Sequence, residues 1–114
     1  MLQSAPFNAY KHHYMSLSSQ QVRALRAEAH RLKLKPVVII GNNGLSESVI
    51  EELRLALAHH ELIKVRVPAL QRADKKSLIE KMLQAVEAEL IQTVGHVAVV
   101  YRLNPDRQRF VKLL

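Results

Sequence analysis

The sequence contains no cysteine. A disulfide framework, a thiolate metal site and a thiol nucleophile are therefore excluded. The absence fits a reducing compartment, and we expect the protein to act in the cytoplasm. No apolar run approaches the roughly 20 residues that a membrane helix needs. The first fifteen residues also lack the apolar stretch of a secretory signal, so we expect a soluble protein.

Acidic residues are few compared with basic ones. The chain has 17 Lys and Arg against 10 Asp and Glu, a formal net charge of +7 and a pI near 10.1. A small basic domain of this kind usually meets a polyanion, which means RNA, DNA or an acidic membrane surface. The alternative is a protein whose basic surface serves solubility alone.

The 114 residues suffice for one domain but not for two. Residues 1–15 are aperiodic, and we predict that they form a disordered extension in front of Met15, in which His12 and His13 have no function. Residues 16–103 are predicted to form the single folded domain. Residues 104–114 are predicted to form a basic, irregular tail, although the sequence RFVKLL at its end could add a short edge strand.

A helix is predicted over 19–33, followed by a strand. Ser18 is its expected N-cap, and Gln21 completes a capping-box pattern. The apolar face of this helix is expected to comprise Val22, Leu25, Ala29 and Leu32. After Pro36, the short run VVII predicts a strand that is buried on both faces.

A second helix is predicted to begin after Ser46, its N-cap, with Leu45 and Ile50 at the positions of a hydrophobic staple. Its buried face is expected to comprise Val49, Ile50, Leu53, Ala56 and Leu57. The sequence LIKVRVP, residues 62–68, then alternates as a strand does. Ile63, Val65 and Val67 are expected to point inward, and Lys64 and Arg66 outward.

Asp74 is the predicted N-cap of a third helix that runs to about Glu89. Its apolar face is expected to comprise Ile79, Met82, Leu83 and Val86. The strands LIQTV and VAVVY then flank Gly95-His96, a two-residue hairpin of type II′. The expected fold is thus a single α/β domain of order αβαβαββ, in which helices pack on a mixed four-stranded sheet.

Only three glycines occur, and two of them enclose the loop Gly41-Asn42-Asn43-Gly44 between the first strand and the second helix. Glycines without Cβ atoms let a phosphate chain approach the backbone, and either can take a positive φ. The loop lies at a helix N-terminus, where free amides and the helix dipole favour an anion. Because Asn and Gly are also ordinary turn residues, a plain turn is the alternative interpretation.

The loop does not fit two nucleotide-binding patterns, the P-loop and the dinucleotide fingerprint, and it has no lysine for a terminal phosphate. A clamp for a nucleic-acid backbone, as in the GXXG loop of KH domains, remains. The expected flanking cations are Arg26, His30, Lys33, Lys35, Lys64 and Arg66. Acidic residues gather instead on the second helix, at Glu47, Glu51 and Glu52.

No catalytic or metal-binding set is apparent, and we expect neither enzyme activity nor a cofactor. His59-His60-Glu61 is not followed by a second histidine at the H-E-x-x-H distance. We expect His60 to have a packed or helix-terminal role. Aromatic residues make up 4% of the chain. Tyr101 could stack on a base, but its ring is expected in the core with the hydroxyl at the rim.

The stretch from Lys35-Pro36 through the loop 41–45 and HHELIKV, together with Gly95 and Tyr101-Arg102, closely resembles the CRM domain. This is the chloroplast RNA splicing and ribosome maturation module, here similar to its stand-alone bacterial YhbY-like form. The resemblance runs from about Leu17 to Arg102. One departure is Asn42-Asn43, where many relatives have a basic residue, so more of the affinity is expected from the flanking cations.

The resemblance implies a fold like the C-terminal domain of translation initiation factor three. It also implies RNA binding through the glycine loop and the adjoining basic surface, on ribosomal RNA in precursors of the large subunit. A monomer is expected. One alternative is a protein-interaction module that docks on a ribosomal protein through the acidic face of the second helix. Another is a phosphate-ester enzyme that uses the loop as a cradle, for which the sequence offers no nucleophile.

Overall fold

The computed structural model describes residues 17–114. The predicted extension 1–15, with His12, His13 and Met15, lies outside the described residues. The described elements are α2 (Ser19–Arg31), β1 (Pro36–Ile39), α3 (Glu47–His60), β2 (Leu62–Arg66), α4 (Arg72–Val86), β3 (Glu89–Val94), β4 (Val97–Tyr101) and the short 3₁₀ helix η1 (Val111–Leu113). The predicted order of helices and strands is confirmed, with η1 in addition.

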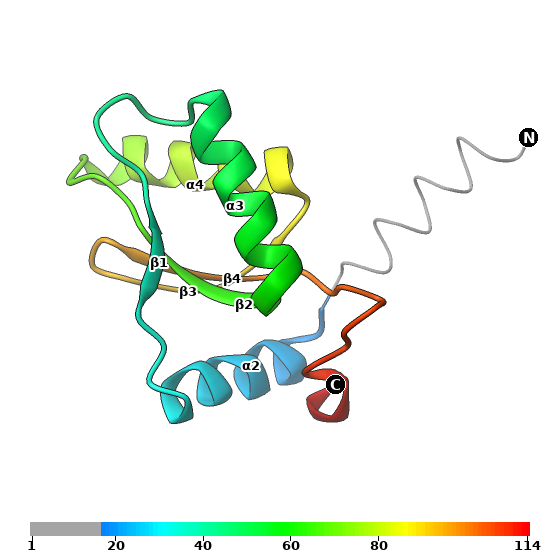
Figure 1. The fold of residues 1–114 in the computed structure, drawn as a ribbon. Helices are drawn as coiled ribbons and strands as arrows, with labels where there is room; N and C mark the ends of the chain where they lie inside the picture. The colour runs from blue at the N-terminus through cyan, green and yellow to red at the C-terminus, as the bar shows by residue number, and fades with distance from the viewer. Residues whose placement is uncertain (1–16) are drawn as a thin grey trace, which may run out of the picture.

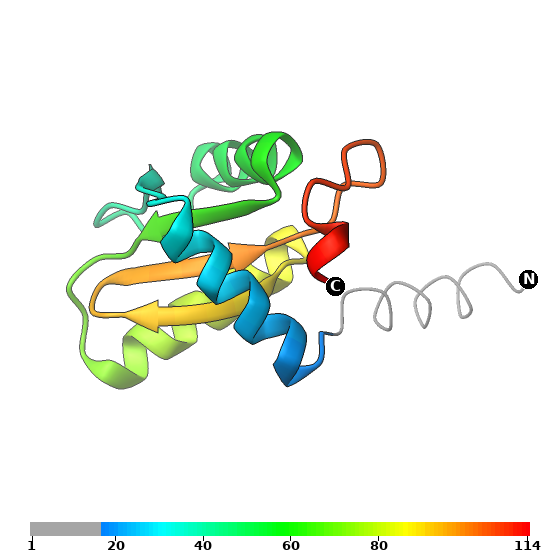
Figure 2. The same ribbon diagram turned by 90° about the horizontal axis from the view of Figure 1, so that it is seen from below.

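The four strands form one mixed sheet in the order β1-β2-β4-β3. β1 pairs with β2 in parallel, whereas β4 pairs antiparallel with both β2 and β3. The sheet is the middle of three layers. Figure 1 shows α3 and α4 on one face of the sheet and α2 on the other. Seen from below, α2 runs obliquely across the strands (Figure 2).

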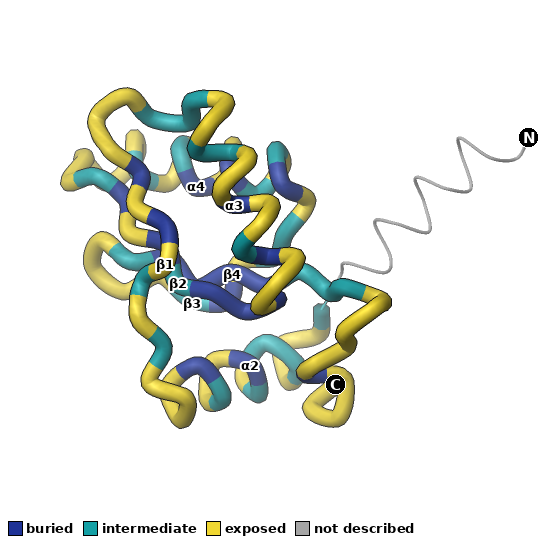
Figure 3. Tube along the Cα trace, in the orientation of Figure 1, coloured by how far each residue is buried: buried dark blue, intermediate teal, exposed yellow. Residues whose placement is uncertain are grey.

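Each face of the sheet carries its own core, and the alternation of β2 explains why. Ile63 and Val65 belong to the core beneath α3 and α4, whereas Leu62 belongs to the core beneath α2. Successive side chains of a strand point to opposite faces, so a strand buried on both sides feeds both cores. The predicted inward positions Ile63, Val65 and Val67 are confirmed, each at most 2% exposed. Figure 3 shows the buried stretches concentrated in the central strands and on the sheet-facing sides of the helices.

Helix α2 begins as predicted but ends two residues early. The Ser18 hydroxyl accepts the N–H of Gln21 at 3.1 Å, and the Gln21 side chain accepts the N–H of Ser18 at 2.8 Å. This is the expected capping box. The helix ends at Arg31, since Lys33 takes a left-handed φ of 54°. Leu34 then packs into the core beneath α2, whereas Leu32, which we expected on the buried face, is 39% exposed.

Helix α3 is capped by Ser46, whose hydroxyl accepts the N–H of Val49 at 3.3 Å. Leu45 and Ile50, the predicted staple pair, both pack against the core. Leu53 and Leu57 are fully buried, which confirms the apolar face.

The prediction for strand β1 is wrong in one respect. Val38 and Ile40 are buried, but Val37 is 48% exposed and Ile39 is 63% exposed. β1 is an edge strand, and the contacts of α2 with the sheet are mainly with β2 and β3. An apolar run indicates a strand, but it does not show whether helices cover both of its faces.

The predicted bounds of the third helix are also wrong. α4 begins at Arg72 after the N-cap Gln71, and it ends at Val86, because Glu87 adopts a left-handed φ of 56°. Asp74 is therefore not the N-cap but lies in the first turn of α4. In that turn its negative charge still interacts favourably with the helix dipole. The apolar face is as predicted: Ile79, Met82 and Val86 are buried.

The hairpin is confirmed and the edge strand at the C-terminus is not. β3 and β4 are joined by Gly95 and His96, and Gly95 has a φ of 57°, as the first position of a type II′ turn requires. RFVKLL instead contains η1. Phe110, just before η1, is 7% exposed and belongs to the core beneath α2.

Candidate nucleic-acid interface

A groove of about 400 Å³ lies between α2 and the uncovered part of the sheet. It is lined by four of the predicted cationic or titratable side chains, Arg26, His30, Lys64 and Arg66. Residues four apart on a helix lie on one face, which places Arg26 beside His30. Alternation along β2 places Lys64 and Arg66 on the α2 side. Four of the expected flanking cations, two from α2 and two from β2, thus meet across one groove.

The floor of this groove is mostly apolar. In the strand register Lys64 stands opposite Val99, and Arg66 stands opposite Val97. The remaining lining residues are Ala29, Pro36, Gln92 and Val94. Within residues 17–114, no Asp or Glu lines the groove. Its potential is therefore positive, and a concave basic surface concentrates anions.

Two other predicted cations lie outside the groove. Lys35 lines a neighbouring pocket of about 250 Å³, which shares Pro36 and Lys64 with the groove. Lys33 is exposed in the turn after α2 and lines neither cavity. Because α2 ends at Arg31, Lys33 does not lie on the helix face that carries Arg26 and His30.

Arg31 is paired and adds little free charge to this surface. Its Nε donates a hydrogen bond to Glu28 Oε1 at 2.9 Å. The hydrogen bond from Arg31, aided by its charge, holds the pKa of Glu28 below its usual value, and the same pair raises the pKa of Arg31. Arg26, by contrast, forms no ion pair with a carboxylate of the described chain.

The glycine loop connects β1 to α3, at the end of the sheet where Arg66 lies. Ile39 is the register partner of Arg66, and the N–H of Ile40 donates to the Arg66 carbonyl at 2.8 Å. Gly41 follows immediately. The N–H of Gly44 closes the turn onto the Gly41 carbonyl at 3.0 Å. Arg66 and the loop thus lie at the same end of the sheet, where β1 and β2 both end.

Only one of the two loop glycines takes a positive φ. Gly44 has a φ of 70°, which favours glycine, whereas Gly41 does not lie in the left-handed region. A Cβ added at Gly41 would have no heavy atom of residues 17–114 within 4 Å. Neither backbone conformation nor packing therefore requires glycine at position 41. Asn42 and Asn43 between them are exposed.

The acidic residues lie away from the groove. Glu47, Glu51 and Glu52 are exposed on α3, and α3 lies on the opposite face of the sheet from α2 (Figure 1). Arg54 approaches Glu51 at 3.8 Å. Glu47, however, begins α3 directly after the cap and is close in sequence to the loop. The acidic residues of α3 are therefore well separated from the groove, but less so from the glycine loop.

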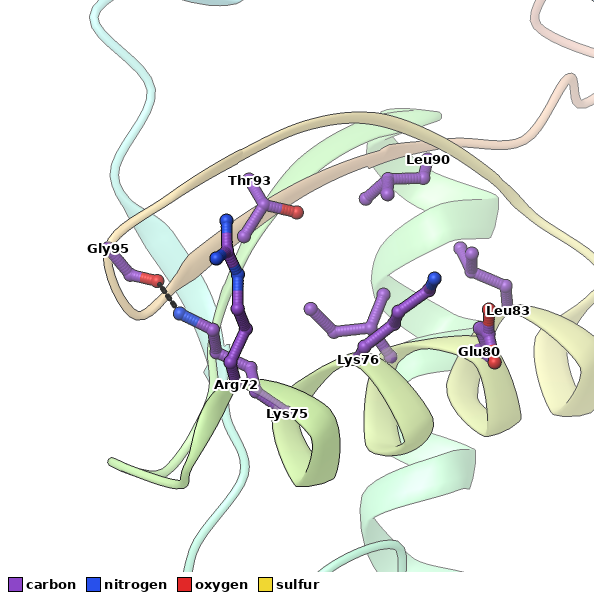
Figure 4. Close-up of a pocket in the computed structure, with 9 residues that line it drawn as sticks. Arg72, Lys75, Lys76, Glu80, Leu83, Leu90, Thr93 and Gly95 are labelled. Atoms are coloured by element: carbon purple, nitrogen blue, oxygen red, sulfur yellow. Dashed lines mark hydrogen bonds between the residues drawn. The ribbon is translucent and has the colours of Figure 1, made fainter.

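A second cavity of about 400 Å³ lies on the other face of β3, against α4. Figure 4 shows Arg72, Lys75 and Lys76 around it, with Glu80 on the same helix. Lys75 Nζ donates to the Gly95 carbonyl at 2.7 Å and so fastens the hairpin to α4. One of the three cations is thus used structurally, and none of them was among the predicted site residues.

Two residues with predicted roles, His60 and Tyr101, lie at the ends of α3 and β4. His60 is exposed in the last turn of α3, so its helix-terminal position is as expected and the packed alternative is wrong. Tyr101 is 3% exposed, which leaves its ring in the core, as expected, and out of reach of a base. Its hydroxyl oxygen is also buried, so the expected position of the hydroxyl at the rim is wrong. Over residues 17–114 no group of three or more His, Asp or Glu side chains is arranged to hold a metal ion. In the same span no helix is long and apolar enough to cross a membrane.

Sequence reasoning missed two contributors to this surface. Arg109 and His60 line the pocket of Lys35, although Arg109 follows the last strand by eight residues. No periodicity places such a residue, since an irregular segment carries no pattern. Gln92 and Val94 of the groove could have been found, because β3 pairs with β4 across the predicted hairpin.

Comparison with known proteins decides the family. A family model described as the CRS1 / YhbY (CRM) domain matches residues 17–102. This chain belongs to that family. The match spans α2 to the end of β4, including the glycine loop and the groove.

Bacterial relatives of this CRM domain carry names that refer to RNA. A Haemophilus influenzae protein named RNA-binding protein is 44% identical over 91 residues, which cover 80% of this chain and 90% of that protein. A Pseudomonas aeruginosa protein named probable RNA-binding protein is 40% identical, over 80% of this chain and 86% of that protein.

A solved structure agrees with the fold of this CRM domain. It is the solution structure of a hypothetical Staphylococcus aureus protein described as a candidate RNA-binding protein. The two share 37% sequence identity and a TM-score of 0.68, with 78% of this chain and 91% of that one covered. The single α/β domain is thereby confirmed. The likeness to the C-terminal domain of translation initiation factor three stays a prediction.

Proposed function

We propose that this CRM domain is a non-catalytic RNA-binding protein that acts in the assembly of the large ribosomal subunit. The proposal includes contact with the backbone of ribosomal RNA through the loop 41–44 and the basic groove, by a monomer in the cytoplasm. The single observation that carries it is Gly41. The part of the chain that the structure describes has no steric or conformational need for glycine there, so a ligand that must approach the main chain accounts for it.

Each part of the surface has a distinct role in this proposal. Gly41 and Gly44 leave the backbone amides accessible, and Asn42 and Asn43 donate hydrogen bonds to phosphate or ribose oxygens. Arg26, Lys64 and Arg66 supply the positive field across the groove, and His30 contributes a ring N–H donor. Lys33, in the turn after α2, and Lys35, just beyond that turn, extend this field.

Binding of this type reads shape and charge more than sequence. Within residues 17–114 no Phe, Tyr or Trp lines the groove, so that His30 is its one aromatic side chain and base stacking contributes little. Phosphate contacts release counterions, which makes the affinity depend steeply on salt. We therefore expect modest sequence preference, with target choice set by the fold of the RNA.

Substitution at Gly41 tests the loop. Gly41→Asp places a negative side chain in open space, so the fold is expected to persist while a phosphate is repelled. In a filter-binding assay at about 0.1 M salt we expect at least a tenfold loss of RNA affinity, about 1.4 kcal/mol. Glu80→Gln on α4 serves as a control that should bind as the wild type does. Unchanged affinity of Gly41→Asp, and of the double variant with Gly44→Asp, would contradict the loop assignment.

The ribosomal target is tested separately. Crosslinking in cells, followed by sequencing of the attached RNA, should recover ribosomal RNA from precursor large subunits. Recovery of messenger, transfer or intron RNA would keep RNA binding and reject the ribosomal role.

A second candidate is docking on a ribosomal protein through the exposed acidic side chains of α3, Glu47, Glu51 and Glu52. Their position on the sheet face opposite the groove favours an independent surface (Figure 1). Charge reversal of Glu51 and Glu52 would then abolish association with the particle and leave binding to naked RNA intact. If both activities survive, this docking role is wrong.

A further inference from the structure

Glu61 is a buried acid that no part of the proposed interface uses. Its residue is fully buried, and its backbone has a φ of 65°, which a side-chain-bearing residue rarely adopts. Both carboxylate oxygens accept backbone hydrogen bonds. Oε2 accepts the N–H of Asn104 at 2.6 Å, and Oε1 accepts the N–H of Arg109 at 2.7 Å. A buried charge is tolerated when it is satisfied in this way.

These bonds fix an irregular segment, which we call the C-terminal arm, residues 102–110. The arm is fastened at further points. The N–H of Arg102 donates to the Glu61 carbonyl at 2.9 Å, and the Asn104 side-chain amide donates to the Ala58 carbonyl at 2.8 Å. Phe110, at the end of the arm, packs edge-on against Tyr101 with ring centroids 6.4 Å apart. The arm therefore has a defined course, although it contains no helix or strand.

The arm brings Arg109 to a pocket that is also lined by three residues from other parts of the chain, Lys35, His60 and Lys64. Its guanidinium lies 5.8 Å from the centroid of the Phe110 ring. It lines the pocket of about 250 Å³ together with Lys35, Lys64 and His60. Glu61 is the nearby acid, and its two oxygens are taken by the backbone of the arm. Lys35, Lys64 and Arg109 form no ion pair with a carboxylate of residues 17–114.

This pocket continues the groove. Pro36 and Lys64 line both, and they stand opposite each other in the register of β1 and β2. The pocket therefore lies at the start of β1, and the glycine loop lies beyond its end. A nucleic-acid strand bound at the loop and in the groove would reach the pocket if it follows β1.

We propose that the pocket formed by Lys35, Lys64 and Arg109 binds a second backbone phosphate of the same RNA strand that the loop binds. This inference rests on the proposed function and extends it to a segment outside the family match, which ends at residue 102. Glu61 acts as a positioning residue, since it holds the backbone of Arg109 without touching the RNA. His60 adds a ring N–H donor at the rim of the pocket.

The test compares two lengths of single-stranded RNA. One probe has about four nucleotides, as many as a GXXG loop clamps. The other has about sixteen, the upper range of a single-strand site on a small domain. The variant Arg109→Gln removes one charge from an exposed side chain and keeps its backbone hydrogen bond. Lys81→Gln, exposed on α4, is the matched control.

We expect Arg109→Gln to weaken binding of the longer probe about fivefold at 0.1 M salt, because one lost phosphate contact lowers the salt slope by about 0.7. Binding of the shorter probe should not change. Lys35→Gln should behave in the same way. The inference is overturned if Arg109→Gln binds the longer probe as Lys81→Gln does, or if it weakens both probes equally.

The same probes separate this inference from the proposed function. Gly41→Asp should weaken both lengths. If it does so while Arg109→Gln weakens neither, the second phosphate site alone is wrong. If the wild type binds neither probe, or Gly41→Asp has no effect, the proposed function fails and this inference fails with it.

Discussion

Glu61 Oε1 and the backbone N–H of Arg109 form a hydrogen bond of 2.7 Å across 48 positions of sequence. Loss of this carboxylate leaves two amides, those of Asn104 and Arg109, without their acceptor. Such a loss costs about 1–3 kcal/mol per buried donor. Because the arm can open to water, we expect Glu61→Ala to lower the free energy of unfolding by about 2 kcal/mol in urea titration.

Hydrogen exchange locates this effect. In Glu61→Ala the amides of Asn104 and Arg109 should exchange much faster, while those of the central strand β4 keep most of their protection. Glu80→Ala, an exposed acid on α4, should change stability by less than about 0.5 kcal/mol. Equal stability of the two variants would show that the arm does not depend on Glu61.

Helix α3 offers a matched pair for the core. Leu53 is 0% exposed and belongs to the core beneath α3 and α4, whereas Leu55, two residues on, is 60% exposed. Leu53→Ala should cost about 3 kcal/mol, from lost burial and the cavity that remains. Leu55→Ala should stay within about 0.5 kcal/mol. Chemical denaturation of both variants checks the prediction, and similar midpoints would contradict the assigned face of α3.

The two loop glycines should respond differently to alanine. Gly44 has a φ of 70°, so Gly44→Ala should destabilise the fold by about 1–2 kcal/mol. Gly41 carries no such constraint, and an added Cβ meets open space. Gly41→Ala should therefore be neutral, or more stable by up to about 1 kcal/mol through the unfolded chain. A large loss of stability in Gly41→Ala would remove the argument that position 41 is kept for a ligand.

Much of the fold could be predicted from local patterns, because the deciding interactions are local. The capping box at Ser18 and the two-residue hairpin at Gly95 each depend on residues within a few positions. Two errors arose where tertiary context decides. The outward face of β1, with Ile39 exposed, depends on where α2 ends in space. The position of the α4 N-cap, at Gln71 rather than Asp74, depends on the turn after β2.

The candidate site was predictable to the same degree. The groove brings together four of the expected flanking cations, Arg26, His30, Lys64 and Arg66. Alternation along the strand had placed Lys64 and Arg66 on one face. The position of Lys33 outside the groove could not be predicted, because the left-handed turn that ends α2 contains no glycine to mark it. Arg109 was not foreseeable at all. Its position depends on a hydrogen bond to Glu61, which is 48 positions away in the sequence. No local pattern predicts a contact over that separation.

Salt dependence gives the sharpest test of which cations touch RNA. For a single strand, log K falls with log salt at a slope of about −0.7 per phosphate contact. Lys64→Gln should therefore reduce the slope by about 0.7, and Lys64→Gln combined with Arg66→Gln by about 1.4. Lys81→Gln, on the other face of the sheet, should leave it unchanged.

The slope is more informative than the affinity, since a partly unfolded variant also binds weakly. Lys64 is half-buried. Its aliphatic stem therefore contributes packing in addition to the charge of its ammonium group, and Gln retains part of that packing. A loss of affinity at constant slope would mean that Lys64 supports the groove structurally. A reduced slope with an unchanged unfolding midpoint would mean that its ammonium group contacts a phosphate.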